Sequence, residues 1–409
     1  MKILYLVHQF YPEYQSGTEK FVFNSAYMAQ KNGNKVKVVT YSFYDNSFYS
    51  NESEGILSQE FNYKGIPVIA IKQIKPPHDL HYSMDDELLY AIGKKILLTE
   101  APDIIHVGHA MRMHAFIKAA IDMHIPYIMT LTDFFLLCPK VNLAPNMKSL
   151  CSGPDKGTAC QLLCPEFSEA YITKRLVTAK LLLAHAKAII SPSQFLAKIF
   201  IQEFDKLKID IINHGISYKS LRKNRRFYTN ETPIVFGYAG YLSFHKGVHI
   251  LLKAFTSIKD ENIKLFVYGP MLEPYINQLQ HIANNDKRII FKGPYSSDNI
   301  GEVFTNIDVL ITPSICYESY QMVLHEGLAS DVPIIASDLG AMSDKIKNNF
   351  NGFKFAAGDH EELQEKIEMI INNRTQLNIL KENIISKMII PTIEQEAYNY
   401  YRLYTKIVK

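Results

Sequence analysis

The sequence predicts an α/β protein built from two doubly wound domains. A chain of 409 residues is longer than one hydrophobic core usually supports. Apolar runs of strand length alternate with helix-length segments, which is the pattern of parallel β-α-β units. The alternation stops after Asn213-His214-Gly215 and starts again at Ile234. We therefore predict one domain over residues 1–213, a second over 214–391, and a closing helix at 392–409 that packs back on the first.

The first half begins with a strand and an amphipathic helix. The helix is predicted over residues 19–31, because Phe23, Ala26 and Tyr27 recur at helical spacing and Asn32-Gly33 ends the pattern. Including the first, five apolar runs are predicted as strands: 3–7, 36–40, 104–106, 127–131 and 188–191.

The second half repeats this rhythm after a polar stretch. Residues 218–226 hold five basic side chains and are interpreted as a solvated linker, with contact to a membrane surface as the alternative. Helices are predicted at 248–255 and 320–329. The predicted strands are 234–239, 264–268, 289–291, 309–312 and 333–337.

Charge and hydropathy exclude several classes of function. Lys and Arg number 44 against 41 Asp and Glu, a net charge of +3, so nucleic acid is not indicated as a partner. The first apolar run is too short for the core of a signal peptide, and no stretch approaches the roughly 18 apolar residues of a membrane span. The sequence predicts a cytoplasmic protein.

Two carboxylates eight positions apart, Glu318 and Glu326, stand at and inside the predicted helix 320–329. Acidic groups are stabilised near a helix N-terminus, whose free N–H groups can also hold an anion. A solvated polar face is the alternative interpretation.

Two glycine-bearing turns are candidate ligand sites. Gly240 leaves a predicted strand and is followed by Lys246 before the next helix, so the backbone can approach a diphosphate and the lysine can neutralise it. Gly17 opens the first helix, where close approach of a ligand is also possible. An ordinary turn and an ordinary helix cap are the respective alternatives.

Taken together, these segments resemble the retaining glycosyltransferases of the GT-B fold, the group called family four. The resemblance covers nearly the whole chain. Besides the segments above, it includes Tyr11-Pro12, Asp103-Ile-Ile-His106, Thr130-Leu-Thr-Asp133, Asn213-His-Gly215 and Asn351-Gly352. It implies two Rossmann-like domains facing a central cleft, with the first binding the acceptor and the second the nucleotide sugar.

The resemblance also implies roles for matching positions. Lys246 and the Gly17 and Gly240 turns would bind the donor diphosphate, Glu326 the ribose hydroxyls, and Glu318 the transferred sugar. The turn at Gly293 would lie at the base. No cofactor is expected for the transfer itself, because a cation and helix N-termini would take the charge of the leaving diphosphate.

Two positions depart from the family pattern. Many relatives carry an arginine where this chain has Tyr241, so a second cation for the diphosphate must come from elsewhere. Many also carry a histidine where it has Thr132, so that residue's role cannot be transferred. Asp133, His106 and His109 remain as candidates for the cleft, and His109 and Asp133 are the catalytic candidates among them, although a histidine at a strand end is often structural.

Four of the five cysteines cluster at Cys138, Cys151, Cys160 and Cys164. Four thiolates can close a tetrahedral structural zinc site, and some relatives carry a similar cysteine-bearing insertion. Paired Cys-x-x-Cys knuckles are absent, so reduced thiols that bind no metal are the alternative. Disulfides are the least expected outcome in a cytoplasmic chain.

The expected partners are a UDP- or GDP-linked hexose and a glycan or lipid-linked glycan acceptor, which the loops 41–75 and 141–165 would select. A basic, leucine-rich helix carrying Lys174, Arg175, Lys180 and Lys187 predicts either peripheral contact with the inner face of the membrane or a solvated surface. The alternatives to a transferase are a nucleotide-sugar epimerase of the same fold, a phosphorylase, or a non-catalytic nucleotide-sugar-binding protein.

Overall fold

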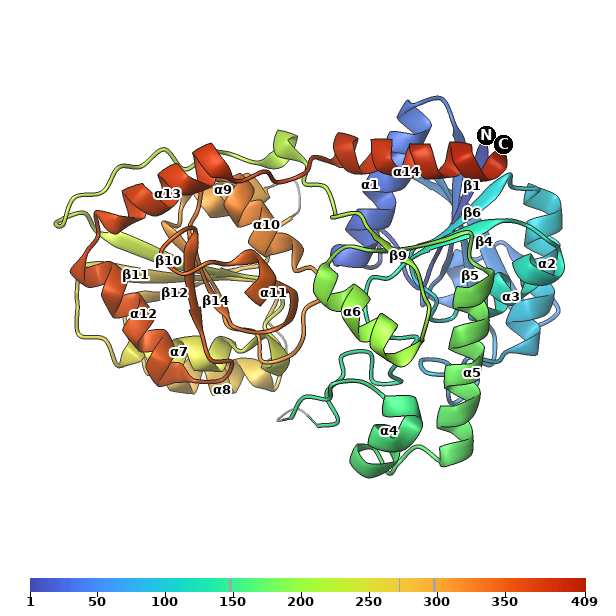
Figure 1. The fold of residues 1–409 in the computed structure, drawn as a ribbon, viewed down its shortest axis with the longest axis horizontal. Coiled ribbons are helices and arrows are strands. Elements are labelled where there is room, and N and C mark those ends of the chain that lie inside the picture. Colours follow the sequence, from blue (N-terminus) through green and yellow to red (C-terminus); the bar gives the residue numbers. More distant parts are fainter. Residues whose placement is uncertain (147–148, 272, 297–298) are drawn as a thin grey trace. The chain divides into compact units, whose positions relative to one another are not determined.

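The computed structural model describes residues 1–146, 149–271, 273–296 and 299–409, and these divide into two compact units (Figure 1). Unit 1 comprises Met1–Pro145, Cys151–Gly215 and Ile393–Lys409. Unit 2 is built mainly from Ile216–Thr392. Each unit has its own sheet and its own core, and each is described by itself.

Unit 1 contains a sheet whose described strands run in the order β3-β4-β5-β2-β1-β6-β7-β8-β9. The strands from β5 to β9 in this order pair in parallel, as predicted for β-α-β units. The strands are β1 Lys2–Val7, β2 Lys35–Tyr41, β3 Asn51–Ser53, β4 Ile56–Tyr63, β5 Ile66–Gln73, β6 Ile104–Val107, β7 Tyr127–Thr130, β8 Ala188–Ser191 and β9 Ile209–Ile211. The helices are α1 Gly17–Lys31, α2 Glu87–Glu100, α3 His114–Asp122, α4 Thr158–Leu163, α5 Glu169–His185, α6 Gln194–Glu203 and α14 Ile393–Val408.

Unit 2 contains a wholly parallel sheet in the order β12-β11-β10-β13-β14-β15. The strands are β10 Ile234–Ala239, β11 Ile263–Tyr268, β12 Ile289–Gly293, β13 Val309–Thr312, β14 Ile334–Ser337 and β15 Gly352–Phe355. The helices are α7 Val248–Thr256, α8 Tyr275–Ala283, α9 Ile300–Thr305, α10 Met322–Ala329, α11 Gly340–Lys345, α12 His360–Asn372 and α13 Gln376–Lys387.

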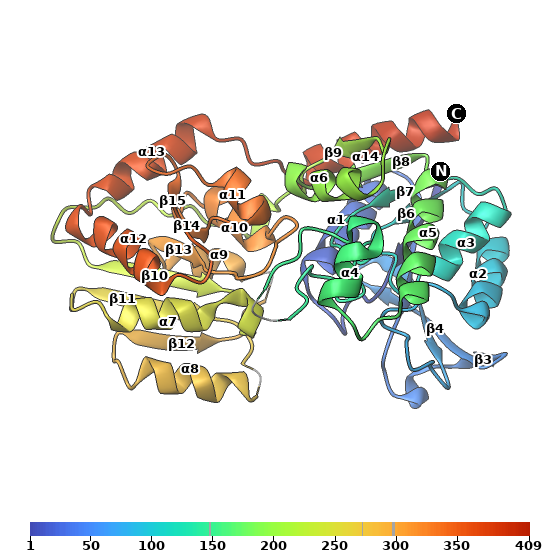
Figure 2. The same ribbon diagram turned by 60° about the horizontal axis from the view of Figure 1, so that its bottom comes forward.

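Helices cover both faces of the unit 2 sheet (Figure 2), because the strand side chains alternate between two apolar clusters. Phe236, Val309 and Ile335 pack with α7 and α12. Leu310 and Ile334 pack on the opposite face with α9 and α10. The doubly wound α/β fold expected from the sequence is therefore confirmed for this unit.

In both units the chain reverses its direction of travel across the sheet beside the first strand. In unit 2 this switch point lies between β10 and β13, and in unit 1 between β1 and β6. Segments that leave the carboxyl ends of two such strands diverge to opposite faces and leave room for a ligand. The fold thus provides one candidate binding position in each unit.

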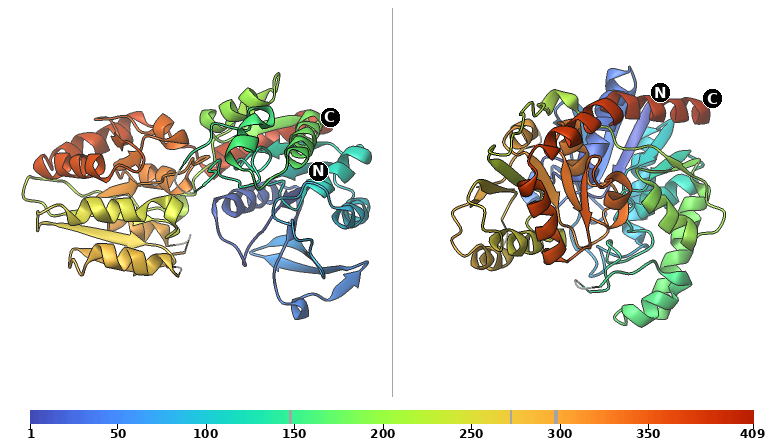
Figure 3. Two further views of the ribbon diagram at one scale, coloured as in Figure 1. Left: turned by 90° about the horizontal axis from the view of Figure 1, so that it is seen from below. Right: turned by 60° about the vertical axis from the view of Figure 1, so that its left-hand side comes forward.

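The prediction that residues 41–75 form an acceptor-selecting loop is wrong in its structure, because most of them form strands β3 to β5. These pair antiparallel and extend one edge of the unit 1 sheet, drawn as blue arrows in Figure 3 (left). Lys64 and Gly65, both with positive φ, join β4 to β5 in a two-residue turn.

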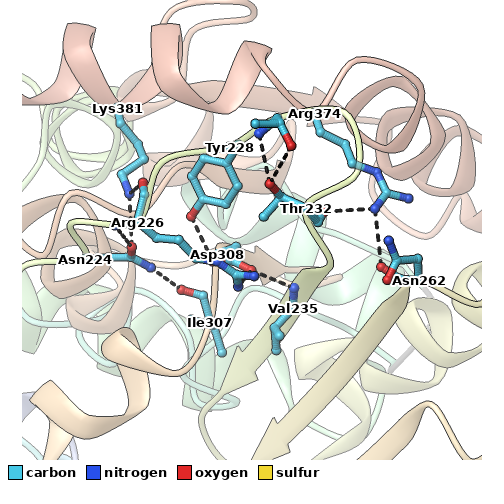
Figure 4. Close-up of polar contacts among 11 residues, drawn as sticks. Asn224, Arg226, Tyr228, Thr232, Val235, Asn262, Ile307, Asp308, Arg374 and Lys381 are labelled. Atoms are coloured by element: carbon cyan, nitrogen blue, oxygen red, sulfur yellow. Dashed lines mark hydrogen bonds and ion pairs between the residues drawn. The ribbon is translucent and has the colours of Figure 1, made fainter.

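The interpretation of residues 218–226 as a solvated segment holds for its five basic side chains, which are all exposed, but some of its side chains also anchor it within unit 2 (Figure 4). Arg226 forms an ion pair with Asp308 at 2.9 Å. Asn224 is buried; its Nδ2 donates to the carbonyl of Ile307 at 2.7 Å, and its Oδ1 accepts from Lys381 at 3.0 Å. Arg226 and Asn224 therefore hold the chain where it enters the second sheet.

The C-terminal segment forms the predicted closing helix, α14, which lies beside α1 within unit 1 (Figure 1). Its Tyr400 and Tyr404 belong to the core cluster of that unit, together with Ile3 and Tyr5 of β1. Among the described residues, no helix is long and apolar enough to cross a membrane.

Candidate functional site

The switch point of unit 2 brings the segment after β10 against the segment after β13. A short 3-10 turn, Phe244–Lys246, leads into Gly247, which has φ +71°. A Cβ atom on Gly247 would lie 1.8 Å from the carbonyl oxygen of Pro313. Only glycine allows this close approach, which holds the turn carrying Lys246 against Pro313.

Lys246 and Glu318 meet at this point. The Nζ of Lys246 lies 2.7 Å from Oε1 of Glu318, and the same oxygen accepts a hydrogen bond from Ser314 Oγ at 2.7 Å. The Lys246 and Glu318 side chains are 27% and 11% exposed. Burial alone would lower the pKa of Lys246, but the Glu318 carboxylate outweighs it and the pKa is raised. The lysine is thus a fixed positive charge.

Glu326 lies within α10 and is buried at 5% exposure, whereas Glu318 precedes that helix. The helix begins at Met322, two residues after the predicted start, because Gln321 adopts a left-handed conformation with φ +53°. Burial, with the charge of Glu326 second, raises the pKa of Tyr295. The Glu326 carboxylate and the Tyr295 hydroxyl therefore lie close enough to interact electrostatically.

The remaining predicted positions of unit 2 lie at strand ends. Gly240 follows β10 with φ +151°, and its N–H donates to the carbonyl of Tyr268 at 3.1 Å. Gly293 ends β12 with φ +76° and open space where a Cβ would stand. Tyr241, which replaces the arginine of many relatives, is 46% exposed and accepts at its carbonyl from the Tyr238 hydroxyl.

The switch point of unit 1 holds the histidine predicted from the sequence. His109 Nε2 lies 2.5 Å from Oδ2 of Asp133, and its Nδ1 accepts from the backbone N–H of Met111 at 3.1 Å. Since Nδ1 accepts, Nε2 carries the proton and donates to Asp133. The ring of His8, which directly follows β1, stacks on His109 with centroids 3.9 Å apart. Sequence reasoning missed His8, although its place after a strand is the signal that selected His109.

Gly17 is the first residue of α1, behind the N-cap Ser16. Glu19 is fully buried, and its carboxylate accepts from the Ser16 backbone N–H at 2.6 Å, as in a capping box. Thr132, at the position of the missing histidine, donates to the carbonyl of Gly108 at 3.1 Å. The structure thus places Gly17 and Thr132 in unit 1 and the other donor candidates in unit 2.

The prediction of His106 as a cleft candidate is wrong, because this residue is structural. It has no exposed surface, and its ring nitrogens lie 2.7 Å from the Tyr404 hydroxyl and 2.8 Å from the Thr130 hydroxyl. Burial, with a smaller contribution from the neighbouring His214, lowers its pKa to about 3. The neutral His106 ring therefore links Tyr404 of α14 to Thr130 of β7.

Cys138, Cys151, Cys160 and Cys164 are buried free thiols that line one apolar pocket with Leu137, Leu143 and Ile172. Within the described ranges, no three His, Cys, Asp or Glu side chains are arranged to hold a metal ion. Zinc at these cysteines stays a prediction. Metal analysis of the purified protein tests it: one zinc per chain would support it, and fewer than a tenth would reject it.

The basic helix is α5, and the structure separates its charges. Arg175 is 2% exposed, donates to the carbonyls of Tyr82 and Phe135, and lies over the Phe135 ring. Lys174 pairs with Asp85 at 2.6 Å. Arg175 therefore cannot belong to a lipid-facing surface, and the peripheral membrane contact remains a prediction without that residue.

Comparisons with known proteins agree along the chain. The model of Glycosyltransferase Family 4 matches residues 15–219, and that of Glycosyl transferases group 1 matches residues 221–387. An uncharacterized glycosyltransferase of Methanocaldococcus jannaschii is 22% identical over 414 residues, 98% of either chain. The capsular polysaccharide biosynthesis glycosyltransferase CapM of Staphylococcus aureus is 28% identical over 213 residues, 50% of this chain and 53% of its own. The crystal structure of Anabaena HepE with UDP and glucose superimposes with a TM-score of 0.71 at 17% identity, covering 99% of this chain and 100% of that one.

Proposed function

Because the chain belongs to the group 1 glycosyltransferases of the GT-B fold, we propose that it moves a hexose from a UDP- or GDP-sugar to a glycan or lipid-linked glycan and retains the anomeric configuration. The observation that carries the proposal is the meeting of Lys246 with Glu318 at the switch point of unit 2. A fixed cation on a glycine-flanked turn suits a diphosphate.

Binding of the donor breaks this ion pair and gives each side chain a new partner. Its diphosphate takes the positive charge of Lys246, and Glu318 is released towards the hydroxyls of the sugar. Glu326, buried in α10, accepts hydrogen bonds from the two ribose hydroxyls. The Gly240 and Gly293 turns give the diphosphate and the base close access to the backbone.

The transfer breaks the bond between the sugar anomeric carbon and the diphosphate oxygen, and it forms a bond from that carbon to the acceptor oxygen. The acceptor proton passes to the leaving phosphate oxygen, so the new bond forms on the face that the diphosphate leaves. Lys246 stabilises the charge that develops on the leaving group. His109, held by Asp133, is a candidate for contact with the sugar or acceptor from unit 1.

Two relatives support the substrate classes. CapM is named for capsular polysaccharide biosynthesis, which favours a glycan acceptor. HepE was crystallised with UDP and glucose, which favours UDP over GDP as the nucleotide.

Slow hydrolysis of donors without acceptor tests the proposal. UDP- and GDP-hexoses are incubated with the protein, and proton NMR follows the first sugar released. We expect one nucleotide class to be hydrolysed with the donor's anomeric configuration preserved. Lys246→Met and Glu326→Gln should each reduce the rate at least tenfold. The exposed Lys253→Met, on the adjoining helix α7, is the matched control and should not.

Release of the opposite anomer would reject retention. Conversion of the donor to its C2 epimer would identify an epimerase instead, and no turnover despite tight nucleotide binding would identify a binding protein.

A further inference from the structure

Unit 1 holds a buried cation at its switch point that the donor site does not use. Arg112 follows β6 by five residues and is 3% exposed. Its backbone has φ +61°, a left-handed conformation that residues other than glycine rarely adopt. Strained residues of this kind concentrate at binding sites, where the surrounding structure holds them in place.

The guanidinium of Arg112 makes no ion pair within the described ranges, although the carboxylates of Glu13 and Glu19 act on it from a greater distance. Among the described residues no carboxylate lies within ion-pair distance, its Nε has no hydrogen-bond partner, and Nη2 donates to the sulfur of Met111 at 3.4 Å. The cation lies over the rings of Tyr41 and Phe43, at 5.6 and 5.0 Å from their centroids. Burial lowers the pKa of Arg112 to about 10. Such burial is costly unless an oxyanion compensates for lost water.

A second polar group at the same switch point, on His8, is also unsatisfied. His8 Nδ1 has no hydrogen-bond partner within the described part of the chain. Burial, and after it the positive charges of His109 and Arg112, holds the pKa of His8 well below its usual value. The half-buried Phe43, which covers the guanidinium, belongs to a connecting segment rather than to a strand. A ligand therefore reaches the cation only when the Phe43 side chain shifts, and this residue is not part of the sheet.

We propose that Arg112 binds an anionic group, a carboxylate or a phosphate, carried by the acceptor. A guanidinium offers two parallel N–H donors that match either oxyanion. The inference rests on the proposed function, because it assigns the switch point of unit 1 to the acceptor. It narrows the acceptor to an acidic saccharide or a phosphate-bearing sugar or lipid.

Thermal unfolding of the full chain with glucuronate, glucose 6-phosphate and glucose tests this proposal. We expect glucuronate, glucose 6-phosphate or both to raise Tm, and glucose to leave it unchanged. Arg112→Met should weaken the apparent affinity for the responding probe at least tenfold, whereas the exposed Arg402→Met should not change it. Lys246→Met separates the two sites: the response should survive in this variant.

Several outcomes would overturn the proposal. They are a wild-type protein that responds to none of the probes, an equal response to glucose, and a response lost in Lys246→Met but kept in Arg112→Met. An Arg112→Met variant that fails to fold would make the guanidinium a structural cation. A failure of the donor site shows instead as an absent response to UDP and GDP, so the two failures are distinguishable.

Discussion

Gly247 has the most restrictive environment of the donor turn, because its φ of +71° and the carbonyl of Pro313 both exclude a side chain. Gly247→Ala should lower the free energy of unfolding by about 3 kcal/mol, since the backbone must move to admit the methyl group. Gly358→Ala is the matched control: φ is +89° there, but no atom lies near a Cβ. Gly358→Ala should lower the free energy of unfolding by only about 1–2 kcal/mol, the cost of placing alanine in a left-handed conformation. Equal losses in urea unfolding would contradict the close contact.

His106 makes the stability of unit 1 depend on pH. Its pKa is about 3 in the folded protein because of burial, against about 6.5 when unfolded. The unfolded chain therefore binds the proton first, and the stabilising contribution is complete above pH 6.5 and lost as the pH falls towards 3. The expected slope is about 1.4 kcal/mol per pH unit from this residue.

Urea unfolding between pH 7 and pH 4 measures this slope. His106→Gln should flatten it by about that amount, whereas His281→Gln, at an exposed histidine, should leave it unchanged. An unchanged slope in His106→Gln would mean that the ring gains a proton without unfolding.

Individual site residues differ in how far the sequence reveals them. Lys246 and Glu318 were predicted because each belongs to a motif with a chemical reason for its spacing, and the structure brings them to 2.7 Å. Arg112 carries no such signal, since a single arginine in a loop shows neither its burial nor its missing partner. Those properties depend on Tyr41 and Phe43, about 70 residues earlier in the chain.

Secondary-structure elements were predicted best where periodicity and end signals agree. The strand 309–312 and the helix 248–255 were placed within one residue of β13 and α7. The β4–β5 hairpin was missed, although Lys64-Gly65 between two alternating runs is a two-residue turn signal. Polar residues along β4, on the outer part of the sheet, weakened the apolar pattern on which the prediction relied.

One buried carboxylate makes several of the contacts that hold the segment leading into β10. Asp308 is 2% exposed and accepts from Tyr228 Oη at 2.8 Å, Arg226 at 2.9 Å and the N–H of Val235 at 2.8 Å (Figure 4). Asp308→Asn should cost about 3 kcal/mol in the free energy of unfolding, because it leaves buried donors without their charged acceptor.

Asp338→Asn is the matched control for that prediction. Asp338 pairs with Lys354 at 2.8 Å, but its side chain is 48% exposed, and water replaces the contact at a cost of about 0.5 kcal/mol. Similar losses in the two variants, measured by urea unfolding, would show that the segment is not anchored through Asp308.

At the scale of the whole molecule, the same topological feature, a switch point beside the first strand of a sheet, occurs in both units. Each unit gathers polar side chains at the carboxyl ends of the two strands where the chain direction reverses: Lys246 and Glu318 in unit 2, and His8, His109 and Arg112 in unit 1. The alternation of strands and helices was enough to predict this architecture. Which ligand each switch point binds depends on side-chain contacts, and the alternation of strands and helices does not predict these contacts.

Calorimetric titration of UDP and GDP into the full chain tests the central claim most directly. The account predicts that at least one of these nucleotides binds, that Lys246→Met and Glu326→Gln each weaken its binding at least tenfold, and that Lys253→Met leaves it unchanged. Binding of UDP or GDP with undiminished affinity in both Lys246→Met and Glu326→Gln, or no binding of either nucleotide to the wild-type protein, would contradict it.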